Sequence, residues 1–191
     1  MRMSIAIPTY EVKGRGVEFL NDLFRTIEIQ TFKDFEVVVS DHSKDDKLVD
    51  VVDEFQYKFD ITYVKNKNDL GNGPANTNNA IRNCSGDIIK VMFQDDFFYD
   101  DEALQKIHDS FNDEHDWLVC GSNHTQDDGN NFYWDLYPRW NDSIIKGVNS
   151  ISSPSVMAAK KKVFDQIKFD ESLVMMMDCE IYYHIKKEFG E

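Results

Sequence analysis

The chain has 191 residues, a formal net charge of −14 at pH 7, and 41% hydrophobic and 13% aromatic residues. This length fits one domain with a substantial core, and the acidic balance argues against a nucleic-acid or anionic-membrane partner. No apolar run approaches the roughly 18 residues of a membrane-spanning helix, and the amino terminus lacks the sections of a signal peptide. We therefore expect a soluble, cytoplasmic protein with no transmembrane segment, and leave open whether it forms a homo-oligomer.

The alternation of apolar runs with segments of helical period predicts an α/β domain with a mainly parallel sheet. We expect strands at residues 3–8, 35–40, 61–64, 88–93, 117–120 and 154–159. We expect helices at residues 17–30, 48–55, from about 74, 101–111, 161–167 and 178–188. Residues 123–153 are rich in Asn, Asp and aromatics without a clear period, so they form either core filler or a binding wall.

The three cysteines are Cys84, Cys120 and Cys179, which are far apart and show no C-x-x-C spacing. Neither a disulfide framework nor a zinc site is indicated, and we expect buried free thiols.

Polar side chains follow three of the predicted strands, at the edge where doubly wound sheets bind ligands. The first strand ends in PTYE (residues 8–11), the second in SDHS (40–43) and the fourth in QDD (94–96). Magnesium and manganese bind through one or two carboxylates together with substrate phosphates. Asp95 and Asp96 are therefore candidate metal ligands, although capping of the next helix or solvation of a loop would explain the same acids.

Residues 68–79 form a Gly- and Asn-rich stretch that matches neither the G-x-G-x-x-G nor the G-x-x-x-x-G-K-[ST] pattern. A dehydrogenase or P-loop enzyme is therefore disfavoured. Amides at the start of the following helix could still contact a diphosphate, with Asn72 and Asn76 as the candidate side chains. Ordinary loop structure explains this composition equally well.

Asp178 and Glu180 lie at the start of the last predicted helix and, two residues apart, point to different sides of it. A carboxylate within reach of an acceptor hydroxyl could act as a general base. The alternative is that both acids only stabilise the helix dipole.

In this order and spacing, the segments resemble the family 2 glycosyltransferases, which have the GT-A fold. The similar segments are IAIPTY (residues 5–10), EVVVSDHSKD (36–45), NNAI (78–81), SGDII (85–89), QDD (94–96), FDESL (169–173) and DCEI (178–181).

The resemblance implies a single GT-A domain over residues 1–191, a Rossmann-like α/β/α sandwich with a nucleotide-sugar donor half to about residue 120 and an acceptor half from about 121. It further implies an inverting hexosyltransferase that uses Mn²⁺ or Mg²⁺. The donor would be a UDP-sugar, UDP-glucose on family frequency, and the acceptor a hydroxyl of a carbohydrate or another molecule. Because the chain ends soon after the last predicted helix, we expect a minimal member.

The donor-side roles that the resemblance implies fall on three strand ends. Pro8, Thr9 and Tyr10 would line the nucleotide pocket, with Glu11 beside them. Asp41 would hydrogen-bond the base, usually uracil in this family.

The remaining implied roles concern the metal, the sugar and the acceptor. Asp95 matches the final acid of the D-x-D motif and would bind the metal, while Asp96 would face the sugar or support the metal. Asp178 matches the acid taken as the base in inverting members.

Two departures from the family pattern stand at these positions. Phe93 occupies the place of the first D-x-D acid, so that contact is missing or supplied by Gln94. Met177 replaces the first acid of the pair before the last helix, which leaves Asp178 alone.

Two other functions stay open at this point. A nucleotidyltransferase that makes an activated sugar would show a basic Gly-rich loop after the first strand, of which residues 11–16 (EVKGRG) are a faint version. An inactive nucleotide-sugar-binding module is the second, with Phe93 as its best evidence. A receiver domain is disfavoured, because its acidic pair belongs near the first strand, where this chain has only Glu11.

Overall fold

The computed structural model describes residues 1–127, 129–173 and 175–190. Its centre is a six-stranded sheet in the order β3-β2-β1-β4-β8-β5. The strands are β1 (Met3–Thr9), β2 (Phe35–Asp41), β3 (Asp60–Lys65), β4 (Ile88–Val91), β5 (Trp117–Val119) and β8 (Met157–Lys160). Strands β1 to β4 are parallel, and β8 runs antiparallel between β4 and β5. The predicted α/β class with a mainly parallel sheet is confirmed.

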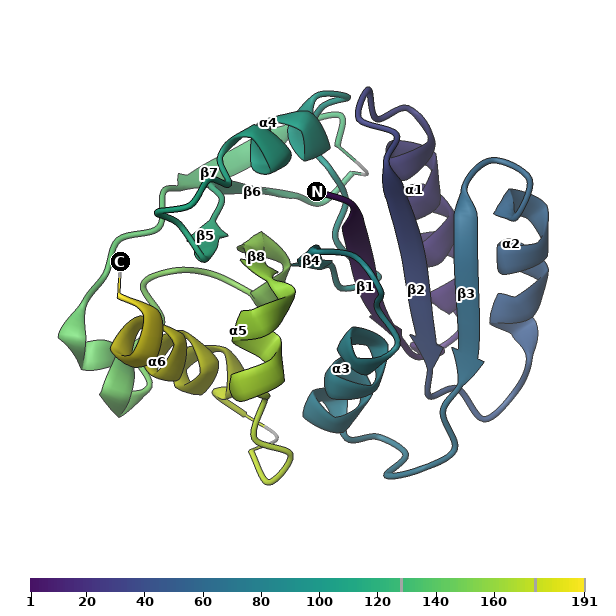
Figure 1. Ribbon diagram of the computed structural model, residues 1–191. Helices are drawn as coiled ribbons and strands as arrows, with labels where there is room; N and C mark the ends of the chain where they lie inside the picture. The colour runs from purple at the N-terminus through teal and green to yellow at the C-terminus, as the bar shows by residue number, and fades with distance from the viewer. Residues whose placement is uncertain (128, 174, 191) are drawn as a thin grey trace.

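Helices cover both faces of the sheet (Figure 1). On one face lie α1 (Gly16–Glu28), α2 (Lys47–Phe55) and α4 (Ala103–Asp109), and on the other lie α3 (Gly73–Arg82), α5 (Lys161–Gln166) and α6 (Met177–Phe189). Each face has its own hydrophobic core. The apolar run of β2 supplies both, since Val37 and Val39 pack into one core and Val38 into the other. Alternate side chains of a strand point to opposite faces, which is why a continuous β-branched run suits a strand covered twice.

Two of the predicted strands lack at least two of their predicted residues in the structure. Strand β4 ends at Val91, and residues 92–96 leave the sheet. Residues Pro154–Val156 form a short 3₁₀ helix, η2, before β8 begins at Met157. Proline has no N–H to donate to a ladder, so pairing starts only after this turn. The last third of the chain contributes an interior strand, β8, to the sheet.

Residues 123–153, whose sequence shows no clear period, are partly regular in the structure. This region contains a β-hairpin of β6 (Ser122–Thr125) and β7 (Phe132–Leu136), followed by the 3₁₀ helix η1 (Asp142–Lys146). The aromatic side chains of the hairpin and its exit are exposed, with Trp134 at 71% and Tyr137 at 73%. These rings are therefore not core filler, whereas Trp140 packs against the core and Ile144 and Ile151 are buried in it.

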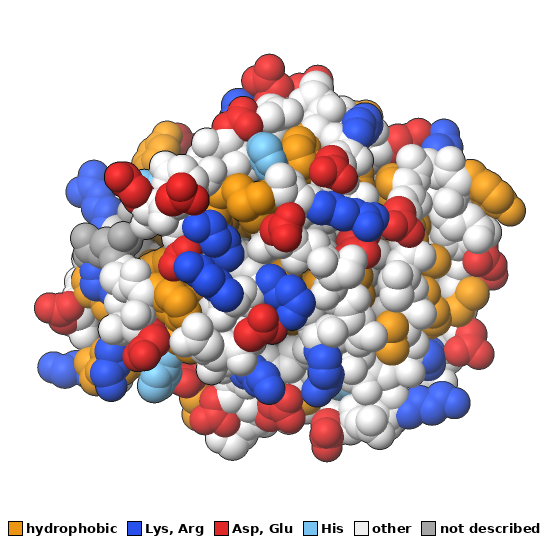
Figure 2. Space-filling model, in the orientation of Figure 1, with side chains coloured by type: hydrophobic (Ala, Val, Ile, Leu, Met, Phe, Trp, Pro, Cys, Tyr) orange, Lys and Arg blue, Asp and Glu red, His pale blue; other side chains and the backbone are white. Residues whose placement is uncertain are grey.

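In the part of the chain that the structure covers, no helix is both long and apolar enough to cross a bilayer. The cysteines are free thiols, Cys84 and Cys179 buried and Cys120 partly buried. Figure 2 shows acidic and basic side chains interspersed over the face that carries α3, α5 and α6.

Candidate functional site: a cavity at the carboxyl ends of the strands

A cavity of about 460 Å³ opens where β1, β2 and β4 end and α3 begins. This volume is in the usual range for small-molecule sites. Six of the residues that the sequence singled out for the donor site line this cavity: Pro8, Thr9, Tyr10, Asn76, Gln94 and Asp95. Residues that the sequence did not assign to a site complete its wall: His42, Gly71, Gly73, Thr77, Phe93 and Met177.

The ends of β1 and β4 are held together by the buried side chain of Gln94. Its Oε1 accepts a hydrogen bond from the Tyr10 backbone N–H at 2.8 Å, and its Nε2 donates to the Tyr10 carbonyl at 2.5 Å. This pair fixes the backbone from which the half-exposed Tyr10 ring extends. Gln94 thus has a structural role in addition to its place on the cavity wall.

Asn76 joins the ends of β1 and β2 by hydrogen bonds in a similar way. Its Nδ2 donates to the carbonyls of Thr9 and Ser40 at 3.1 and 2.9 Å, and its Oδ1 accepts from the Ser40 hydroxyl at 2.7 Å. Asn72 instead caps α3, since its Oδ1 accepts from the Ala75 N–H at 3.0 Å. Asn72 does not line the cavity, although its neighbours Gly71 and Gly73 do.

Asp95 and Asp96 lie where the chain leaves β4. Asp95 borders the donor-side cavity, and both acids border a second cavity of about 350 Å³. Asp95 is exposed to solvent, but the surrounding protein atoms partly desolvate its carboxylate. This desolvation and the charge of Asp96 raise the pKa of Asp95. A cation bound here would relieve the repulsion between the Asp95 and Asp96 carboxylates.

The donor set at this point suits a hard divalent cation that also binds phosphate. Among the residues that the structure describes, no group of three or more His, Cys, Asp or Glu side chains is arranged to hold a metal ion. Magnesium and manganese sites of the substrate-bridging kind need only one or two protein carboxylates, because phosphate oxygens and water complete them. Asp95 and Asp96 fit that kind of site.

Asp41 is fully buried at the end of β2 and does not line the cavity. Its Oδ1 accepts from the Ser43 N–H at 2.7 Å, and its Oδ2 accepts from the Tyr63 hydroxyl at 2.7 Å and from Lys65 Nζ at 2.9 Å. Burial raises the pKa of Asp41, but these hydrogen bonds outweigh it and hold the pKa below its ordinary value. In the structure Asp41 organises the turn after β2.

Glu11 lies behind the cavity wall rather than on it. Its backbone N–H donates to the Ser43 hydroxyl at 2.8 Å, and its carboxylate faces the first turn of α1. A Cβ atom on Gly16 would lie 2.7 Å from Glu11 Oε2 and 3.0 Å from Glu11 Cα, so a larger residue at this position would have to displace Glu11. The faint Gly-rich loop of residues 11–16 thus packs against the start of α1.

Asp178 is the second residue of α6, directly after Met177 of the cavity wall. Its Oδ2 accepts a hydrogen bond from Asn149 Nδ2 at 2.5 Å, and its Oδ1 accepts from the Cys179 N–H at 2.8 Å. Asn149 Nδ2 also donates to the Ser152 carbonyl, and the hydroxyl of Ser153 lies 3.4 Å from Asp96 Oδ2. The segment 149–153 therefore connects the surroundings of Asp178 and Asp96.

The second cavity extends from Asp95 and Asp96 toward the β6–β7 hairpin and α4. Aromatic rings from separate segments meet at its rim, where the ring centroids of Tyr99 and Phe132 lie 5.1 Å apart. Lys90, whose Nζ is buried and donates to the Ser155 carbonyl, lies on its inner wall. Burial lowers the pKa of Lys90.

Sequence comparison finds glycosyltransferases among the relatives of this chain. The uncharacterized glycosyltransferase MJ1057 of Methanocaldococcus jannaschii is 25% identical over an alignment of 187 positions, which covers 94% of this chain and 63% of that protein. The GalNAc(5)-diNAcBac-PP-undecaprenol beta-1,3-glucosyltransferase of Campylobacter jejuni is 32% identical over 96 residues, 50% of this chain and 30% of that protein. The match to each of these proteins thus spans less than two thirds of its length.

Solved glycosyltransferase structures share the fold. TarS residues 1–349 of S. aureus, in complex with UDP, superposes with a TM-score of 0.77 at 19% identity, over 99% of this chain and 55% of that one. The mannosyltransferase PcManGT from Pyrobaculum calidifontis, in complex with GDP-Man and Mn²⁺, superposes with a TM-score of 0.71 at 16% identity, over 98% of this chain and 52% of that one. The expected GT-A fold is confirmed.

The family model described as Glycosyl transferase family 2 matches residues 4–182. Because this match covers nearly the whole chain, the protein belongs to glycosyltransferase family 2.

Proposed function

We propose that this chain is an inverting, divalent-metal-dependent hexosyltransferase that takes a sugar from a UDP-sugar and passes it to an acceptor hydroxyl. UDP-glucose is the donor that we propose. The observation that carries the proposal is the cavity at the carboxyl ends of the strands, on whose wall Tyr10, Asp95 and the first residue of α6 meet. Asp178 is the next residue of α6 and therefore lies at the edge of the donor site.

A UDP donor is supported by the UDP complex of TarS, and glucose by the name of the Campylobacter relative. A divalent cation is supported by the Mn²⁺ complex of PcManGT and by the two carboxylates at the end of β4. When bound, such a cation would neutralise the charge that grows on the diphosphate as the sugar bond breaks. Asp95 and Asp96 are the side chains that would hold it.

Asp178 is our candidate for the general base. Its carboxylate would take the proton of the acceptor hydroxyl while that oxygen attacks the anomeric carbon, and the bond from this carbon to the diphosphate oxygen would break on the opposite face. The hydrogen bonds from Asn149 and from the Cys179 N–H hold the carboxylate in one orientation. A positioned base of this kind contributes roughly 10²- to 10⁴-fold to the rate.

The second cavity is our candidate for the acceptor site. It shares Asp95 with the donor-side cavity, so an acceptor bound there would reach the point where the sugar is released. The exposed rings of Tyr99 and Phe132 at its rim suit the apolar face of a sugar, and polar side chains such as Asn123 suit its hydroxyls. This supports a carbohydrate acceptor, with the acceptor half beginning at about residue 121.

The same proposal includes a cytoplasmic location. It is supported by the free thiols, since disulfides are rare in reducing compartments. Burial raises the pKa of the Cys84 thiol to about 12, which keeps it protonated and inert.

The proposal is tested by comparing Asp178→Asn with the unaltered protein in a transfer assay and in a binding assay with UDP and manganese. We expect transfer to fall by about 10²- to 10⁴-fold, while UDP affinity stays within about twofold, because the base acts on the acceptor and not on the donor. Glu188→Gln, an exposed acid of the same helix, is the matched control and should leave both quantities unchanged.

Near-normal transfer by Asp178→Asn would remove this residue from the role of base. Product analysis separates the other two functions, because a nucleotidyltransferase releases pyrophosphate and an inactive module releases no product. Release of UDP with a glycosylated acceptor is the expected result. Membership of glycosyltransferase family 2 supports it over both alternatives.

A further inference from the structure

The β6–β7 hairpin, which lies outside the six-stranded sheet (Figure 1), carries three aromatic rings that contact one another. The ring centroids of His124 and Tyr133 lie 6.0 Å apart, and those of His124 and Trp134 lie 5.4 Å apart. The ring planes of these two pairs differ by 30° and 36°, so the three rings form one aromatic surface. Tyr133 is 47% and Trp134 71% exposed, and His124 is exposed as well. We call these three residues the hairpin platform.

A distortion of the backbone brings Tyr133 and Trp134, which are neighbours in the sequence, to the same face of the hairpin. Successive side chains of a regular strand point to opposite faces. Trp134 has a φ of 62°, and the pairing shifts register between Ser122 and His124, so β7 holds one extra residue at this point. A positive φ is uncommon for a bulky residue, and a bulge often redirects a side chain. Because strained residues of this kind concentrate at functional sites, the position of the Trp134 ring indicates a ligand.

The face of β6 that carries the hairpin platform leads back to the candidate base. Strand β6 has no extra residue, so Ser122 and His124 point to the same face, two positions and roughly 7 Å apart along the strand. The Ser122 hydroxyl lies 3.1 Å from the hydroxyl of Ser152. Asn149 donates both to the Ser152 carbonyl and to Asp178. A chain molecule with one end at Asp178 can therefore extend over Ser122 onto the hairpin platform.

The charge of the hairpin determines which kind of chain molecule fits. Residues 122–136 include three aspartates and no Lys or Arg. A chain that bears phosphate or carboxylate groups, or an anionic lipid surface, would be repelled. A neutral carbohydrate would not be repelled, and the C–H face of a sugar ring packs well on an aromatic ring while its hydroxyls stay in contact with water. The hairpin platform therefore suits neutral sugars.

We propose that the acceptor is a neutral oligosaccharide whose terminal sugar lies beside Asp178 and whose following sugars stack on the hairpin platform. The inference rests on the function proposed above and names the class of its acceptor. Ser122, Ser152 and Asn149 lie between the carboxylate of Asp178 and the rings, so a single sugar beside the base does not reach them. The hairpin platform thus favours a longer chain over a monosaccharide.

The test follows the indole N–H signals of the full chain in ¹H–¹⁵N spectra. Neutral cello-, malto- and chito-oligosaccharides, from the monosaccharide to the pentasaccharide, are added without UDP or metal. The signal of Trp134 should shift with the pentasaccharide of at least one series and not with its monosaccharide. The signals of Trp117 and Trp140, whose indole N–H groups donate to Gly190 and Asp142, should not move.

Trp134→Gly removes the ring at a backbone position that glycine adopts readily, so its Tm should equal or exceed that of the unaltered protein. Its affinity for the pentasaccharide, measured by calorimetry, should fall by about three- to tenfold, the scale of one aromatic contact. Trp134→Phe should recover part of this loss. Tyr57→Ala is the matched control, because Tyr57 is 87% exposed in the turn after α2, and it should keep the affinity.

Transfer from UDP-glucose connects this binding to the acceptor. The ratio of kcat/KM for the pentasaccharide to kcat/KM for the monosaccharide should fall in Trp134→Gly by the same factor as the affinity, and should not change in Tyr57→Ala. An unchanged ratio in Trp134→Gly would overturn the proposal.

The binding experiment can overturn the proposal by itself. Absence of a Trp134 response to all three series would do so, and so would equal responses to the monosaccharide and the pentasaccharide. A response to heparin oligosaccharides or phosphatidylglycerol vesicles in place of the neutral sugars would show that an anion binds instead. Dimerisation that Trp134→Gly abolishes, without a sugar response, would identify a second copy of the chain as the occupant. Failure of UDP to bind, or absence of transfer to every acceptor while the Trp134 response is intact, counts against the proposed function.

Discussion

The side chain of Asn78 forms two hydrogen bonds with the backbone of Phe169, which lies 91 residues further along the chain. Asn78 Nδ2 donates to the Phe169 carbonyl at 2.8 Å, and Asn78 Oδ1 accepts from the Phe169 N–H at 3.0 Å. Asn78 Nδ2 also donates to Glu171 Oε1 at 2.9 Å. These contacts hold the turn before α6 against α3, and so position Asp178 relative to the donor-side cavity.

We expect Asn78→Ala to destabilise the protein strongly. Both Asn78 and Phe169 are buried, so the substitution leaves a backbone N–H and a carbonyl without partners. At about 1–3 kcal/mol for each of the two buried groups, the loss should be about 2–6 kcal/mol, which lowers the Tm by about 4–24 °C at this chain length. Thermal unfolding measures it.

The control for this substitution is Asn83→Ala at the end of the same helix. Asn83 is exposed and donates within the helix to the Asn79 carbonyl. Its replacement should change the stability by no more than about 0.5 kcal/mol. Equal Tm values for Asn78→Ala and Asn83→Ala would show that the link to Phe169 does not stabilise the fold.

The two segments joined by Asn78 are among those on which the resemblance to family 2 was based, and their partnership explains part of what the sequence could predict. Other such segments are also structural. Glu36 Oε1 accepts from the Ser85 N–H, and a Cβ on Gly86 would lie 2.7 Å from the Ser4 hydroxyl. These contacts lie at the opposite end of the sheet from the cavity. They identify the fold reliably because the backbone needs those residue types, and they say little about the substrate.

The hairpin was missed for a physical reason. Strand prediction relies on alternation between a buried and an exposed face, but β7 is exposed over nearly its whole length. Trp134 within it has a φ of 62°, and the pairing with β6 shifts register between Ser122 and His124. A bulge of this kind breaks the two-residue period. The pairing is supported instead by contacts such as the Asn123–Asp135 hydrogen bond at 2.5 Å, which join residues across the turn.

The sequence predicted which segments form the donor-side cavity better than it predicted which side chains line it. Composition does not show which groups an amide side chain contacts. Asn72 and Asn76 both looked like ligand-binding amides, yet Asn72 caps a helix and Asn76 bonds to two strand ends. His42 was visible directly after a strand, and its position was the signal that could have placed it on the cavity wall. The contact of Asp41 with a base stays a prediction.

Asp95→Asn should separate stability from activity. The pKa of Asp95 is raised by partial desolvation and by the charge of Asp96, so the ionised carboxylate is disfavoured in the folded protein. The stability linked to this group is fully present below the unfolded pKa of about 3.9 and is lost as the pH rises through the folded value. At pH 7 without metal, Asp95→Asn should therefore have a Tm equal to or above that of the unaltered protein.

The same substitution should abolish the rise in Tm that manganese with UDP produces, because a ligand stabilises only a state that it binds. Transfer should fall by about 10²- to 10³-fold, the usual effect of removing one group that stabilises developing charge. Asp101→Asn, an exposed acid further along, is the control that should keep both responses. A normal manganese-dependent shift in Asp95→Asn would exclude this residue as a metal ligand.

The acid limb of the stability curve should depend on Asp41. Because its folded pKa lies below the ordinary value, its contribution is present above the unfolded pKa of about 3.9 and is lost as the pH falls through the folded value. Asp41→Asn removes an acceptor of Tyr63 and Lys65, and should cost about 1.5–3 kcal/mol at pH 7. Urea unfolding at pH 7 and at pH 3 should show this deficit shrinking at the lower pH.

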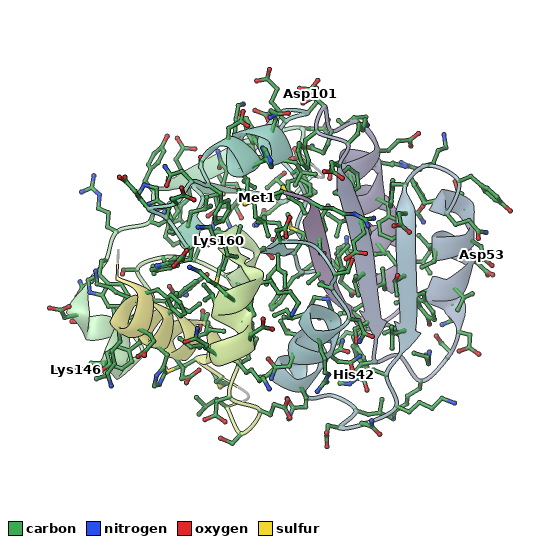
Figure 3. All side chains as sticks on the ribbon, in the orientation of Figure 1. Met1, His42, Asp53, Asp101, Lys146 and Lys160 are labelled. Atoms are coloured by element: carbon green, nitrogen blue, oxygen red, sulfur yellow. The ribbon has the colours of Figure 1, made fainter. Side chains whose placement is uncertain are left out.

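Asp53→Asn, on the exposed face of α2 and labelled in Figure 3, should show little deficit at either pH. A deficit for Asp41→Asn that is the same at both pH values would mean that packing, and not the ionised carboxylate, is what the turn after β2 requires.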